Sequence, residues 1–79
     1  MKIGDAVYRK SDGSLEGIIC SEISYYPNFV YFTCLYKHED GTFLAYGLSV
    51  SHTYPRFFIT STDSEVHKQL LLEYKLSIL

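Results

Sequence analysis

Two Asp-Gly dipeptides constrain this chain most, because each stands between two short runs of strand-forming residues. They are Asp12-Gly13 and Asp40-Gly41. Both residue types tolerate positive φ, so the dipeptide is typical of the tight turn of a β-hairpin. Strand-forming runs occur at residues 2–10, 15–24, 29–36, 42–50 and 56–60. We therefore expect five short antiparallel strands, which form a small barrel or a strongly bent antiparallel sheet.

The hydrophobic period changes after residue 61, where the pattern becomes helical. Thr62 and Glu65 have the spacing of a capping box, in which two side chains satisfy each other's exposed amides. The expected helix begins at Asp63 and ends near Ser77. The element order is βββββα, so the class is mainly β with one C-terminal α-helix. The 79 residues make a single domain, with the strands in 1–60 and the helix in 62–79.

Residues 29–36 give the clearest strand, because both of its faces are apolar or aromatic. This pattern predicts a central strand. Gly47 lies inside the next predicted strand, where a glycine often marks a bulge or a barrel corner.

Charge and cysteine content limit the possible partners and compartments. The net charge is −2, whereas domains that bind duplex nucleic acid are usually basic. Cys20 and Cys34 lie in separate apolar stretches, and we expect both to be buried free thiols. Charged residues interrupt any leader-like run near the start, and no apolar stretch reaches the ~20 residues of a membrane span. We expect a cytoplasmic protein that does not enter membranes.

Several short stretches carry a family resemblance. They are Ile3-Gly4-Asp5-Ala6-Val7, Asp12-Gly13, Gly17-Ile18-Ile19 and Val30-Tyr31-Phe32, followed by Gly41 and Leu48. Over about residues 2–60 the pattern resembles the SH3-like small barrels of the KOW and Tudor-like families. The resemblance implies a five-stranded SH3-like barrel, here closed by the helix. KOW-type barrels often bind RNA or the transcription and translation machinery, and Tudor-like barrels bind methylated side chains in aromatic cages.

Nucleic-acid binding is kept as the alternative function. The candidate residues for a KOW-like nucleic-acid or ribonucleoprotein interface are Lys2, Arg9, Lys10 and Lys37. Acidic side chains stand beside the basic ones in both Asp-Gly turns, which disfavours contact with phosphate.

The chain has no pattern typical of an enzyme or a metal site. His38, His52 and His67 are scattered without metal-ligand spacing, and we expect them to be exposed to solvent. No recognisable spacing supports a nucleophile and base pair or a phosphate-binding loop. We expect no catalytic residues, no metal and no cofactor.

Two loops each contain an aromatic residue followed by proline, at Tyr26-Pro27 and Tyr54-Pro55. If both loops lie at one end of the domain, Tyr25, Tyr26, Tyr54 and Arg56 form an exposed rim that could bind a partner. The alternative, which we favour, is that the rings cover the core as a lid.

The predicted helix carries two apolar stripes. At about 100° per residue, the first one is broad enough to cover the sheet, and it consists of Val66, Leu70, Leu71, Tyr74 and Ile78. The second lies on a face that a monomer should keep polar, and it consists of Leu72, Leu76 and Leu79. The second stripe predicts self-association, as a homodimer; the alternatives are fraying of the last helical turn, or a helix that is covered on both sides within its own domain. The favoured function is a non-enzymatic protein-interaction module that acts as an adaptor, a regulator or an inhibitor. An inhibitor of the kind that phages encode would fit this function.

Overall fold

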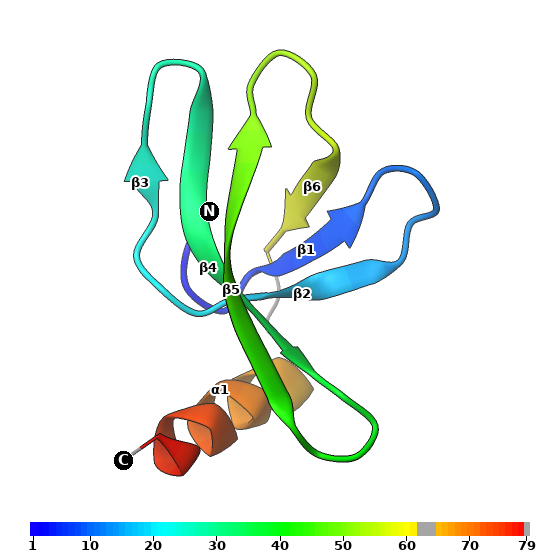
Figure 1. Cartoon of the computed structure of the whole chain (residues 1–79), viewed down its shortest axis with the longest axis vertical. Coiled ribbons are helices and arrows are strands. Elements are labelled where there is room, and N and C mark those ends of the chain that lie inside the picture. The colour runs from blue at the N-terminus through cyan, green and yellow to red at the C-terminus, as the bar shows by residue number, and fades with distance from the viewer. Residues whose placement is uncertain (62–64, 79) are drawn as a thin grey trace.

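The structure is a computed structural model that describes residues 1–61 and 65–78, and it contains one antiparallel sheet and one helix (Figure 1). The elements are β1 (Ala6–Arg9), β2 (Leu15–Ile19), β3 (Ser24–Tyr25), β4 (Phe29–Lys37), β5 (Phe43–Ser51), β6 (Phe57–Thr60) and α1 (Glu65–Ser77). The mainly β class and the C-terminal helix are confirmed. The described chain has six strands where five were expected, because the second predicted strand is interrupted.

The interruption arises because β2 and β3 pair with the same edge of β4. Ile19 pairs with Cys34, and Ser24 pairs with Tyr31. More residues therefore lie between Ile19 and Ser24 than between their partners Cys34 and Tyr31, and the extra residues do not pair with β4. The carbonyl of Thr33 still accepts a hydrogen bond of 2.9 Å from the Cys20 N–H.

Both Asp-Gly turns form as the sequence predicts. Gly13 and Gly41 have φ angles of 73° and 90°, in the region that glycine adopts without steric cost. The Asp12 carboxylate accepts a hydrogen bond of 2.9 Å from the backbone N–H two residues further on, and the Asp40 carboxylate does the same at 3.0 Å. These bonds fix the turns from within.

The sheet is open. Its strand order is β3-β4-β2-β1-β6, and β5 pairs with β4 over nine residues. In the part of the chain that the structure describes, β5 pairs only with β4, and β6 pairs only with β1. The expected closure into a barrel is therefore not confirmed. The long β4–β5 hairpin runs through the length of the molecule, while the β1–β2 hairpin points to the side, so the sheet is strongly bent (Figure 1).

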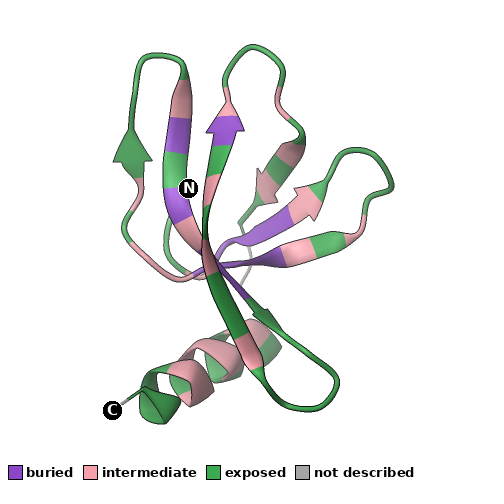
Figure 2. Ribbon diagram, viewed as in Figure 1, coloured by how far each residue is buried: buried purple, intermediate pink, exposed green. Residues whose placement is uncertain are grey.

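The main core lies on the inner face of the bent sheet. Figure 2 shows buried segments on β1, β2, β4 and the end of β5. The buried residues of this cluster are Val7, Ile19, Val30, Phe32, Cys34 and Val50. The β4–β5 register runs without a shift past Gly47, so the bulge expected at this glycine is wrong. A side chain there would instead collide with the ring of Tyr31.

The opposite face also carries a buried row, which the helix covers. Ala6, Ile18 and Leu35 pair across β1, β2 and β4, and all three are buried. Lys37 lies two residues beyond Leu35 on this same face. Its Nζ lies 2.9 Å from a carboxylate oxygen of Glu73 in α1. The helix is thereby placed over this face.

Only part of the predicted covering stripe faces the sheet. Leu70, Leu71 and Tyr74 are half-buried, whereas Val66 and Ile78 are exposed. The middle of the helix packs on the sheet, where the ring of Tyr74 lies edge-on to Phe43 with centroids 5.6 Å apart.

Candidate functional site

The two aromatic loops lie at the same end of the molecule (Figure 1). They follow β3 and β5, and the backbone N–H of His52 donates a 3.0 Å hydrogen bond to the carbonyl of Asn28. This bond continues the β4–β5 ladder beyond both strands. The two loops therefore lie at one end of the domain, as the predicted rim requires.

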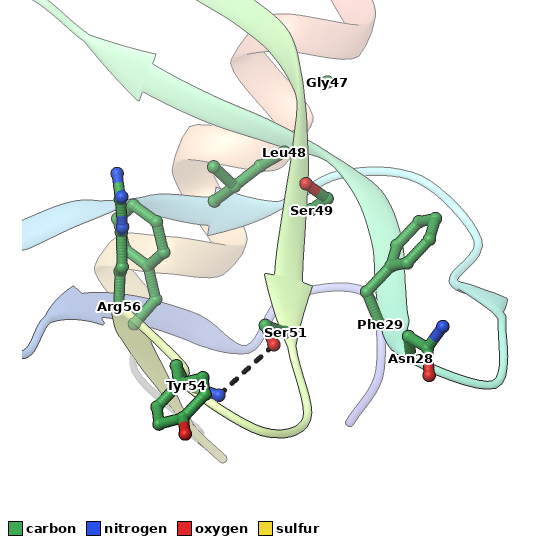
Figure 3. Close-up of a pocket in the computed structure, with 9 residues that line it drawn as sticks. Asn28, Phe29, Gly47, Leu48, Ser49, Ser51, Tyr54 and Arg56 are labelled. Carbon is green, nitrogen blue, oxygen red and sulfur yellow. Dashed lines mark hydrogen bonds between the residues drawn. The ribbon is translucent and has the colours of Figure 1, made fainter.

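A hollow of about 660 Å³ opens at this end, beside β5 and the chain that leads into β6. Its walls consist of Asn28, Phe29, Gly47, Leu48, Ser49, Ser51, Tyr54, Arg56 and Phe57. Figure 3 shows Leu48 and Arg56 on one side of β5, and Phe29 and Asn28 on the other. Ser51 shapes the loop, because its Oγ accepts hydrogen bonds from the backbone N–H groups of Thr53 and Tyr54. We call this space the seam hollow.

The structure brings three of the four predicted rim residues to the seam hollow. Tyr54 and Arg56 line it directly. Tyr26 stacks on Phe29, with ring centroids 4.7 Å apart, and so backs one wall. Tyr25 instead lines a different hollow near the N-terminus. Tyr25, Tyr26 and Tyr54 are 68%, 49% and 84% exposed, so the favoured lid over the core is wrong.

Positive charge gathers around the seam hollow although the chain carries a net charge of −2. Arg56 is exposed, and within the described residues it makes no ion pair. Arg56 and Phe57 also line a smaller adjoining hollow of about 290 Å³, together with Arg9, Lys10 and Ser11. Among the described residues, no acidic side chain lines either hollow.

The four predicted nucleic-acid residues do not share one surface. Arg9 Nε lies 2.5 Å from a carboxylate oxygen of Glu16, and Lys37 is paired with α1. Arg9 and Lys10 line one hollow, Lys37 lines a second beside the helix, and Lys2 lines a third near the N-terminus. A continuous basic track for phosphates is therefore not formed by these residues.

A polar network on the inner face was not predicted from the sequence. The β1–β2 register shifts so that Glu16 becomes an extra residue of β2, and its carboxylate binds both Arg9 and the hydroxyl of Tyr46. A bulge turns a side chain to the other face, which explains why Glu16 points inward. Burial, and then the bond to Glu16, raises the pKa of Tyr46. The hairpin could have revealed Arg9 beside Glu16, but Tyr46 comes from a distant strand.

The thiols and histidines form no reactive group. Cys20 and Cys34 are both free, as predicted, with Cys34 buried and Cys20 half-buried. Burial raises the pKa of Cys34 to about 11, which disfavours the nucleophilic thiolate. His38 and His52 are exposed as predicted, but His67 is half-buried. Across residues 1–61 and 65–78, no group of three His, Cys, Asp or Glu side chains could hold a metal ion.

The second helix stripe is exposed where it is described. Leu72 and Leu76 are 51% and 62% exposed. The third predicted member, Leu79, lies outside the described residues, as does Thr62 of the predicted capping box. In the described part of the chain, no helix has the length and apolar character needed to cross a membrane.

Comparison of this chain with known protein families, with curated proteins and with solved structures finds no match. Its function is therefore inferred from its own residues and their arrangement.

Proposed function

We propose that this chain is a non-enzymatic protein-interaction module that binds a partner protein at the seam hollow. The observation that carries the proposal is that Tyr54 and Arg56 both line the seam hollow. The side chain of Tyr54 is 84% exposed, and the guanidinium of Arg56 makes no ion pair among the described residues. Tyrosine and arginine are favoured at binding hot spots because each joins a large apolar area to a polar end. Binding there would let the module act as an adaptor, a regulator or an inhibitor.

The walls of the seam hollow support this proposal. The stack of Tyr26 on Phe29 holds one wall in place, so less side-chain entropy is lost when a partner binds. Leu48 and Phe57 add apolar area at the base. The volume of about 660 Å³ falls within the range of binding pockets, about 300–1,000 Å³.

Protein binding is preferred over the nucleic-acid alternative because of how the basic residues are used. Arg9 and Lys37 are each engaged by a glutamate, and Lys2 lies in a separate hollow. Nucleic-acid affinity depends on several cations that follow one phosphate backbone, and this set lacks that arrangement.

The proposal has two further parts. The module self-associates through α1, and the exposed Leu72 and Leu76 support this homodimer because an isolated subunit would leave their apolar surface in water. The sheet is an open relative of the SH3-like barrel, and the return of β6 to pair with β1 supports this assignment.

The test is affinity capture from the native cell, read by mass spectrometry. Bait with the Tyr54→Ser and Arg56→Ser substitutions should lose the partner and keep its melting temperature, because both side chains are exposed. Tyr25→Ser is the matched control, since Tyr25 is also exposed but lines a different hollow. A captured protein that is lost equally from both baits, or from neither, would contradict the proposed site.

A further inference from the structure

In the described part of the chain, one edge of β5 is unpaired along the whole strand. The His38 N–H donates to the carbonyl of Thr42 at 2.8 Å, and the His52 N–H donates to that of Asn28 at 3.0 Å. Hydrogen-bonded pairs alternate in an antiparallel ladder, so these two bonds fix which residues of β5 bond to β4. The backbone groups that point to the free edge belong to Phe43, Ala45, Gly47, Ser49 and Ser51.

The free edge lacks the usual protection against pairing. Exposed edge strands are commonly guarded by charged side chains, by proline or by a bulge. Strand β5 contains no charged residue and no proline, and its register with β4 is continuous. Gly47 and Ser49 keep the edge accessible beside the seam hollow, since neither carries a large side chain. Such an edge is suited to main-chain pairing with another extended segment.

Positive charge lies beside the part of this edge that borders the seam hollow. Arg56 stands at the junction of the seam hollow and the adjoining one, and Lys10 lines the latter. The Lys10 N–H donates a 2.9 Å hydrogen bond to the Arg56 carbonyl, so the two residues are held side by side. Carboxylates of a bound segment would meet these two cations, and none of the described residues that line the two hollows is acidic.

From this we infer that an extended, acidic segment of the partner protein joins the free edge of β5 as an additional strand, with carboxylates beside Arg56 and Lys10. The inference rests on the proposed function and gives its binding mode and partner chemistry. The alternating donors and acceptors along β5 match a peptide backbone. A nucleic-acid backbone has phosphate acceptors but no regular amide donors, so it cannot complete this ladder.

The experiment uses a displayed library of random dodecapeptides, selected on the full chain. Enriched peptides should be rich in Asp and Glu and in β-branched residues. Ser49→Pro removes one free-edge N–H without breaking a bond to β4, because Ser49 bonds away from that strand. We expect Ser49→Pro to weaken binding of the enriched peptide about tenfold, since one main-chain hydrogen bond and its neighbours are lost. The matched control, Ser49→Ala, keeps the N–H and should bind like wild type.

Three results would overturn the inference: no enrichment, enrichment of basic or proline-rich peptides, or equal binding by Ser49→Pro and Ser49→Ala. Tighter binding of an oligo-dT dodecamer than of the best peptide would also overturn it. The same Ser49 variants are then used as bait in the cell. A partner that needs Tyr54 and Arg56 but ignores Ser49→Pro would leave the proposed function standing and refute strand addition. A partner that ignores Tyr54 and Arg56 would refute the site itself.

Discussion

Gly17 and Gly47 both lie in strands, yet replacing each with alanine should have different consequences. A Cβ added at Gly17 would stand 2.5 Å from Cys34 Sγ and 2.5 Å from the carbonyl oxygen of Leu35, closer than real Cβ atoms approach. Leu35 is paired with strands on both sides, so its backbone cannot yield without disturbing the sheet. A Cβ at Gly47 would meet the hydroxyl of Tyr31, whose ring is 45% exposed and can rotate away.

The structure sets the size of the difference. Overpacking a rigid site lowers the free energy of unfolding by about 1–3 kcal/mol. Replacing glycine with alanine also raises it by about 0.4–1 kcal/mol, because the unfolded chain has fewer conformations. We expect Gly17→Ala to lower the free energy of unfolding by about 2 kcal/mol, which lowers Tm by about 8–16 °C in a domain of this size. Gly47→Ala should stay within about 1 kcal/mol of wild type, because Tyr31 can move.

Urea unfolding followed by circular dichroism measures both free energies, and equal m-values would show that the unfolded states are comparable. A Gly17→Ala protein within about 0.5 kcal/mol of wild type would refute the reasoning, as would a larger loss for Gly47→Ala. The first result would mean that β2 and β4 do not approach as closely as the structure shows, and the second that the ring of Tyr31 cannot move away from Gly47.

Three further predictions concern the helix and the buried thiol. Wild type should sediment as a dimer and the Leu72→Glu, Leu76→Glu variant as a monomer; a wild type that stays monomeric at high micromolar concentration would contradict the dimer. Burial raises the pKa of Cys34 to about 11, so maleimide should label it about a hundredfold more slowly in the folded protein than in denaturant, and equal rates would contradict its burial. Lys37 lowers the pKa of Glu73, so its stabilising effect is present above the usual value of 4.5 and is lost as the pH falls through the lower folded value. Hydrogen exchange of α1 should therefore accelerate, relative to the sheet, as the pH falls below 4.5, and less so in Lys37→Met, which lacks the ion pair already.

Local chemistry made the strands and turns predictable. Asp-Gly turns, alternation and the change of period depend on neighbours in sequence, and both hairpins and the helix formed as expected. The interruption after Ile19 was not predictable, since it depends on how many residues of β4 lie opposite. Closure of the sheet into a barrel could not be predicted from the sequence either, because it depends on whether the two edge strands meet in the folded protein.

In the candidate site, too, residues chosen by local sequence could be predicted, whereas contacts between distant segments could not. Tyr54 and Arg56 could be selected from residue type and loop position, and both line the seam hollow. Tyr25 has the same local chemistry but lines a hollow with residues of the N-terminus, which are distant from it in sequence. The bond from Glu16 to Tyr46 joins strands that only the folded sheet brings together.

The uncharged edge of β5 has a consequence for the supply of this protein in a cell. An edge that accepts a partner's strand cannot distinguish it fully from β5 of another copy, which is equally neutral. Overproduction without the partner would then promote edge-to-edge assembly into insoluble material, and co-production of the partner would restore solubility. If strand addition is how the module binds, the amounts of the two proteins would need to be matched, and the open strand would couple the synthesis of the module to that of its partner.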